Sequence, residues 1–115
     1  MEQLNIEWFP FLSDKEFDKL DILMKTFPND LMPHQIAVSL GVDVIKALAV
    51  IHILSEKYQS NMLLLIYHKC DISKIVYARQ LNSGFPELPW VCSDCDEEVN
   101  SYSDLNFDIM IKFSD

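Results

Sequence analysis

The sequence predicts a small α+β protein with three helices, then a β-hairpin, then an irregular segment that ends in a strand. Three observations predict this order: a helix-capping motif at Ser13–Glu16, a glycine turn at Gly41, and a change from helical spacing to alternation after Ser60. The chain has 115 residues, of which 50% are hydrophobic, so it has the length of one domain and enough apolar side chains for a core.

The first helix is expected from about Asp14 to Thr26. The side chain of Ser13 can accept a hydrogen bond from the amide of Glu16, whose own side chain reaches back to the serine amide. Apolar side chains then follow at helical spacing, at Phe17, Leu20, Leu23, Met24 and Phe27. Pro28 and the two polar residues after it end the helix.

Two further helices are expected on either side of Gly41. Pro33 suits the first turn of a short second helix, whose apolar face comprises Ile36, Ala37 and Leu40. Gly41 supplies the backbone freedom that the turn needs. Asp43 is the expected cap of a third helix over about Val44–Tyr58.

The segment Ile36–Val42 resembles the helix-turn-helix family, in which a small residue such as Ala37 lets two helices approach and a glycine such as Gly41 occupies the turn. Together with the hairpin that follows, residues 13–81 resemble a winged-helix domain. The resemblance implies a winged-helix-like three-helix core with a β-hairpin wing, within a single domain of residues 1–115.

The hairpin and the last third of the chain read as β-structure and loops. Met62–Cys70 and Lys74–Gln80 are expected to form two strands, with Asp71–Ser73 as the turn between them. Residues 82–115 are expected to hold an acidic knuckle and then a final strand over Leu105–Phe113.

Charge is unevenly distributed along the chain, whose net charge is −9. Residues 1–30 hold seven acids and three bases, residues 31–81 three acids and five bases, and residues 82–115 eight acids and one base. A DNA-binding protein normally carries a basic stripe on its surface. Because both ends of this chain are acidic, we do not expect it to bind nucleic acid specifically. They serve either as a solvated surface or as a tail that meets a basic partner or mimics nucleic acid.

Cys92 and Cys95 form a C-x-x-C spacing, which allows two thiolates to bind one metal ion. His68 and Cys70 are two positions apart on a predicted strand and should face the same side. The four side chains are a candidate Cys₃His site for a structural zinc ion, and the Trp90 lead-in resembles that of zinc ribbons and knuckles. Two alternatives remain open: a turn with three reduced thiols and no metal, and a redox C-x-x-C.

The third helix is apolar on both sides, with Val44, Leu48, Ile51 and Leu54 as its expected core face. Its other side, and an aromatic segment within Leu4–Leu12, pack against the chain itself or bind a partner. The candidate partner-binding residues are Trp8, Phe9, Phe11, Ile45, Ala49, Val50 and Ile53.

We therefore expect a non-catalytic protein-interaction module or accessory subunit that binds a protein partner or self-associates. The chain contains no recognisable catalytic motif, and we expect no enzyme activity and no small-molecule substrate. Its apolar stretches are too short for a membrane helix and its N-terminus is acidic, which favours a cytoplasmic protein. The alternatives are a DNA-binding transcriptional regulator that uses residues 43–58, and an acidic DNA-mimic inhibitor.

Overall fold

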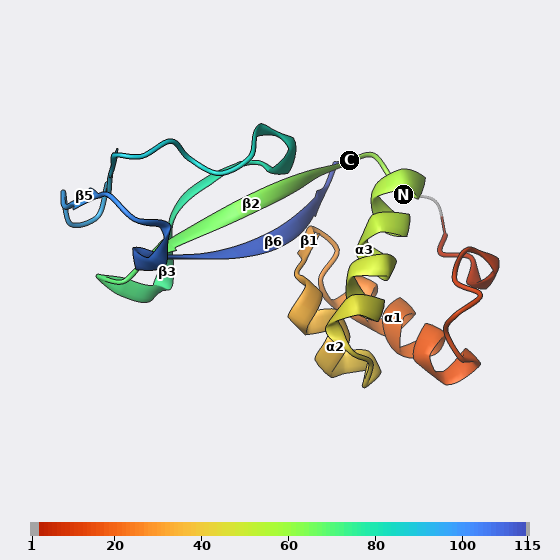
Figure 1. Ribbon diagram of the computed structural model, residues 1–115. Coiled ribbons are helices and arrows are strands. Elements are labelled where there is room, and N and C mark those ends of the chain that lie inside the picture. Colours follow the sequence, from red (N-terminus) through yellow and green to blue (C-terminus); the bar gives the residue numbers. More distant parts are fainter. Residues whose placement is uncertain (1–2, 115) are drawn as a thin grey trace. The chain divides into compact units, whose positions relative to one another are not determined.

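The computed structural model describes residues 3–114, which form three helices and antiparallel β-structure (Figure 1). The α+β class is therefore confirmed. The chain divides into two compact units, one made of residues 3–61 with residues 111–114, and the other of residues 62–110. Each unit is described by itself.

Helix α1 spans Asp14–Thr26, as predicted. Its capping box is complete, because the Glu16 amide donates to Ser13 Oγ at 3.1 Å and the Ser13 amide donates to Glu16 Oε1 at 2.9 Å. The helix ends at Phe27, whose amide still donates to the carbonyl of Leu23. A 3₁₀ turn, η1, precedes it at Ile6–Trp8.

Helices α2, Pro33–Leu40, and α3, Val44–Lys57, also lie where they were expected. Gly41 between them has a φ of 71°, a conformation that costs glycine little. The Lys46 amide donates to Asp43 Oδ1 at 2.8 Å, which caps α3. No single helix within residues 3–114 is long and apolar enough to span a membrane, although α2 and α3, bent by 116°, pass that test together by length and composition.

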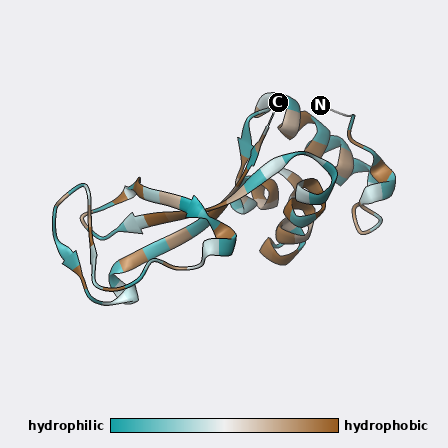
Figure 2. Cartoon of the chain, turned by 90° about the horizontal axis from the view of Figure 1, so that it is seen from above, coloured by the Kyte–Doolittle hydropathy of each residue, from teal (hydrophilic) through white to brown (hydrophobic). Residues whose placement is uncertain are grey.

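The core face of α3 was predicted correctly at Ile51 and Leu54 but wrongly at Val44 and Leu48. Val44 is 54% exposed and Leu48 is 39% exposed, whereas the buried face comprises Ala47, Val50, Ile51 and Leu54. Because α3 is apolar on both sides, its spacing alone did not identify the buried face. The hydrophobic residues of these helices appear as long brown stretches in Figure 2.

A short strand that the sequence did not predict completes the first unit. Strand β1, Asp30–Leu31, pairs antiparallel with the end of β6, Leu105–Phe113. Leu31 lies opposite Ile111, and both side chains are fully buried. Strand β6 has the predicted bounds.

Strands β2, Ser60–His68, and β3, Asp71–Gln80, form the predicted hairpin, but its turn is placed differently. The connection consists of Lys69 and Cys70, since Asp71 already pairs with His68. Asp71 Oδ1 accepts hydrogen bonds from the amide and the hydroxyl of Ser73. The two polar residues on which the predicted turn was based therefore form a local hydrogen-bonded pair at the start of β3. The strand order in the sheet is β1-β6-β2-β3.

The second unit also contains a small hairpin of β4, Trp90–Val91, and β5, Glu98–Val99. Two 3₁₀ turns, η2 at Leu81–Ser83 and η3 at Tyr102–Asp104, lie before and after this hairpin. Buried side chains from β2, β5 and β6 form the core of this unit, at Leu64, Ile66, Val99 and Leu105. Trp90 of the small hairpin packs against this core.

Candidate metal centre

The four predicted metal-ligating side chains meet in the second unit. His68 is the last residue of β2, Cys70 follows in the β2–β3 turn, and Cys92 and Cys95 lie in the turn between β4 and β5. Their ligand atoms all lie within 4.8 Å of one another. The sequence prediction of one cluster is thus confirmed, although Cys70 lies in a turn and not on a strand.

Two of the separations have the size that a tetrahedral zinc site requires. The sulfurs of Cys70 and Cys92 are 3.8 Å apart, and Cys95 Sγ is 3.5 Å from His68 Nδ1. Zn–S bonds of about 2.3 Å and Zn–N bonds of about 2.0–2.1 Å at tetrahedral angles give S···S edges of about 3.8 Å and S···N edges of about 3.6 Å. The donor set and these two edges fit a bound metal ion.

The imidazole of His68 is oriented with Nδ1 toward the sulfurs. His68 is fully buried, and its other ring nitrogen, Nε2, has no hydrogen-bond partner. Nδ1 instead lies 3.5 Å from Cys95 Sγ, and a metal bond to Nδ1 would give the ring a strong interaction. The orientation therefore identifies Nδ1 as the nitrogen available to a metal.

The turn that carries Cys92 and Cys95 is held by its own backbone. The Cys92 amide donates to the carbonyl of Glu97 at 3.0 Å, and the Asp96 amide donates to the carbonyl of Cys92 at 2.8 Å. Asp96 has a φ of 61°, in the left-handed region that aspartate enters more readily than most residues. The left-handed conformation of Asp96 was not predicted from the sequence. The available signal was the presence of an aspartate directly after the second cysteine.

The three thiols differ in their electrostatic environment. Burial opposes ionisation of Cys92, but the backbone amides of Cys95 and Asp94 donate to its sulfur, and the pKa of Cys92 is lowered from its ordinary value of 9.0. Desolvation and the neighbouring sulfurs of Cys95 and Cys92 raise the pKa of the Cys70 thiol to about 12. Ionisation of all three thiols would require a cation for charge compensation, which a divalent metal ion would supply when bound.

Acidic residues around the cluster are paired with two lysines, one in the β2–β3 turn and one on β3. Lys74 binds Asp94 Oδ1, while Asp94 Oδ2 lies 3.8 Å from the sulfur of Cys70. Lys69 lies 3.6 Å from carboxylate oxygens of both Glu97 and Asp104. These pairs, which the sequence analysis did not predict, neutralise part of the acidic C-terminal segment within the second unit.

The predicted partner-binding residues do not share one environment. Phe9 and Val50 are fully buried, so the expectation that they are accessible to a partner is corrected. Ile45 is 75% exposed. The remaining members are partly buried, namely Trp8, Phe11, Ala49 and Ile53. Phe9 packs among the rings of Phe11 and Phe17, which explains its burial.

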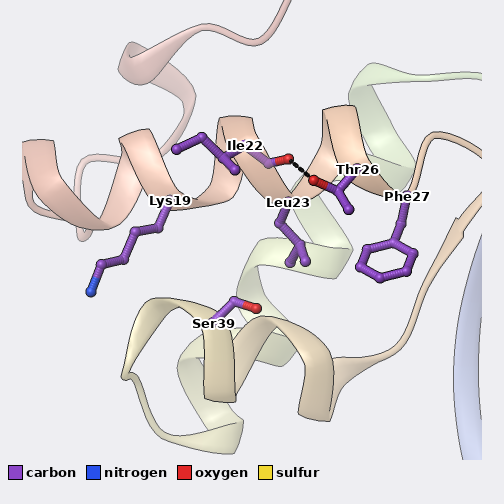
Figure 3. A pocket seen from close by; sticks show the side chains of 6 residues that line it. All are labelled: Lys19, Ile22, Leu23, Thr26, Phe27 and Ser39. Carbon is purple, nitrogen blue, oxygen red and sulfur yellow. Dashed lines mark hydrogen bonds between the residues drawn. The ribbon is translucent and has the colours of Figure 1, made fainter.

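A shallow pocket of about 360 Å³ lies between α1 and α2 in the first unit (Figure 3). The side chains of Ile22, Leu23 and Phe27 make its lining mainly apolar. Its polar groups are few, and the hydroxyl of Thr26 already donates to the carbonyl of Ile22 at 2.8 Å. This lining offers no arrangement of groups suited to acid–base or nucleophilic chemistry.

Comparisons with protein-family models, with curated proteins and with solved structures give no significant match to this chain. The assignment of the candidate metal centre therefore rests on its geometry.

Proposed function

We propose that the chain is a non-catalytic protein-interaction module, or accessory subunit, in which one structural zinc ion stabilises a winged-helix-like fold. The proposed ligands are His68, Cys70, Cys92 and Cys95. The observation that carries the proposal is the convergence of these four ligand atoms, from the β2–β3 and β4–β5 hairpins of the second unit, within 4.8 Å. The winged-helix reading is supported by the order of three helices followed by the β2–β3 hairpin.

A structural role follows from the number of ligands. A catalytic zinc site keeps one position for water or substrate, whereas four protein ligands fill the tetrahedron. The ion would tie the β2–β3 turn to the β4–β5 hairpin. It would add to the hydrogen bond from Ser93 Oγ to the carbonyl of Val76 at 3.2 Å and to the ion pair of Lys74 with Asp94. Metal binding would thus contribute directly to the folding of the second unit.

Cobalt substitution tests this assignment. Titration of metal-free protein with Co²⁺ should produce the intense visible bands of a tetrahedral thiolate complex, together with sulfur-to-metal charge-transfer absorption, and Zn²⁺ should displace the cobalt. The Cys92→Ser variant serves as the matched control and should lose both features. A weak octahedral spectrum from the wild-type protein would contradict the proposal.

A protein partner is proposed because the N-terminal end of α3 carries exposed apolar side chains. The side chains of Val44 and Ile45 are 54% and 75% exposed, at positions where a DNA-reading helix carries hydrogen-bonding groups. Val38 on α2 is also 81% exposed. Exposed apolar side chains on both sides of the Gly41 turn favour a protein surface, either a second copy or another chain.

The DNA-binding alternative has less support. Two of the five basic residues in residues 31–81 are Lys69 and Lys74, and both are paired with carboxylates. Paired lysines contribute less to the neutralisation of phosphates.

Sedimentation velocity tests the partner surface. We expect the wild-type chain to self-associate and the Ile45→Asp variant to do so more weakly while it remains folded. Ile72→Asp is the matched control, because Ile72 is 72% exposed but lies on β3. Equal sedimentation of all three proteins would exclude a second copy as the partner at this surface. Salt-dependent duplex binding with nanomolar affinity by the wild type would contradict the proposal of a protein partner.

A further inference from the structure

The three cysteine residues of the proposed metal centre differ in their exposure. Cys92 is buried, whereas Cys70 and Cys95 are exposed. The Cys92 sulfur accepts hydrogen bonds from the amides of Asp94 and Cys95, while the Cys70 sulfur faces the carboxylate of Asp94 at 3.8 Å. Of this pair, Cys70 is therefore the residue that an oxidant in solution can reach.

Cys70 also has a second thiolate within reach. The distance of 3.8 Å between Cys70 Sγ and Cys92 Sγ exceeds a disulfide bond length by roughly 1.8 Å, which small side-chain rotations can supply. A tetrahedral metal ion holds two thiolates at this distance, so its removal leaves a pair already positioned to join.

We propose that Cys70 is an oxidation site, at which hydrogen peroxide converts the zinc centre into a Cys70–Cys92 disulfide with release of the metal. This inference rests on the zinc centre proposed above. It adds that oxidation of the centre causes loss of the zinc ion. In contrast to a chelator, peroxide would remove the metal while leaving a covalent connection between the same two turns.

The chemistry balances in two steps. The Cys70 thiolate attacks one oxygen of hydrogen peroxide, so that an S–O bond forms, the O–O bond breaks, and the departing hydroxide takes a proton to become water. The Cys92 thiolate then attacks the Cys70 sulfur, so that an S–S bond forms and the S–O bond breaks, with a second hydroxide leaving and becoming water. Two thiolates, one peroxide and two protons thus give one disulfide and two waters.

Loss of two ligands releases the metal. His68 and Cys95 remain, and two ligands do not complete a structural zinc site. The competing disulfide, between Cys92 and Cys95, lies within the C-x-x-C turn. That turn is held by the hydrogen bond of Ser93 to Val76 and by the ion pair of Asp94 with Lys74.

The test treats zinc-loaded protein with hydrogen peroxide and follows zinc release with a chromophoric chelator. Trypsin then separates the peptide of residues 70–74, which contains Cys70, from the peptide of residues 80–112, which contains both other cysteines. We expect zinc release to parallel the appearance of a cross-link between these two peptides, with fragmentation assigning it to Cys92. Dithiothreitol should reverse the cross-link and restore zinc binding.

Three results would overturn the inference: zinc retained under peroxide, a disulfide confined to the peptide of residues 80–112, or sulfinic acid without a disulfide. A Cys70→His variant, which keeps four possible ligands, should release zinc more slowly and form no such cross-link. If that variant binds no zinc, the peptide map of the wild-type protein still shows whether the Cys70–Cys92 disulfide forms. A wild-type protein that binds no zinc before oxidation would instead refute the zinc centre itself.

Discussion

The sulfur of Cys70 lies 3.8 Å from the sulfur of Cys92, although the two residues are 22 positions apart in the sequence. The first belongs to the β2–β3 turn and the second to the turn after β4. Their contact therefore requires the second unit to be folded, and any metal ion that binds both is linked to that folding.

Removal of the metal should loosen the β4–β5 hairpin. Trp90 lies two residues before Cys92, is partly buried and has its ring 6.5 Å from that of Tyr77. In a Trp8→Phe background, where Trp90 is the remaining tryptophan, a strong zinc chelator should shift the fluorescence emission to longer wavelength. Re-addition of zinc should reverse the shift, and unchanged emission would contradict a structural role for the ion.

Replacing the histidine ligand by a thiolate should preserve metal binding. His68→Cys creates a Cys₄ donor set, another known zinc combination, and removes the buried Nε2 that has no partner. We expect the variant to retain zinc in competition with a chromophoric chelator. His68→Ala should weaken zinc binding by on the order of 100-fold or more, because even outer contacts of zinc ligands contribute about 10–100-fold. Equal affinity of His68→Ala and wild type would exclude His68 as a ligand.

The capping box of α1 should make stability depend on pH. The hydrogen bond from the Ser13 amide holds the pKa of Glu16 below its ordinary value of 4.5, with desolvation opposing this shift. A lowered carboxylate pKa in the folded state contributes stability above the unfolded value, and this contribution is lost as pH falls through the folded value. The difference in unfolding free energy between wild type and Glu16→Gln should therefore shrink below pH 4.5. A difference that does not change between pH 7 and pH 3 would contradict the assignment.

The aromatic N-terminal segment should contribute to the core through one residue. Phe9 is fully buried, and Phe9→Ala should lower the free energy of unfolding by roughly 3–5 kcal/mol. Ile6→Ala, in the same segment but 40% exposed, should cost less than about 1 kcal/mol. Chemical denaturation measures both values, and similar small losses would show that the segment is not part of the core.

Local signals predicted the helices well. The capping box at Ser13 and the glycine at Gly41 act within a few residues, so the bounds of α1 and α2 followed directly from the sequence. The hairpin turn was misplaced because Asp71 and Ser73 have turn-type side chains, whereas the actual turn, at Lys69 and Cys70, has none. The two-residue strands β1, β4 and β5 are too short to show a period.

The candidate site could be predicted only in part. Residue type and the C-x-x-C spacing identified its four side chains, since few residue types bind zinc. The ion pair of Lys74 with Asp94 and the orientation of His68 depend on segments that meet only after folding. The exposure of Ile45 and the burial of Val50 could not be separated by sequence, because both sides of α3 are apolar.

Metal content of the purified protein tests the central claim most directly. Elemental analysis of wild-type chain expressed with zinc and purified without chelator should give about one zinc ion per chain, and the Cys92→Ser variant should contain far less. Only trace metal in the wild-type protein, or equal zinc in both proteins, would contradict a zinc centre formed by His68, Cys70, Cys92 and Cys95.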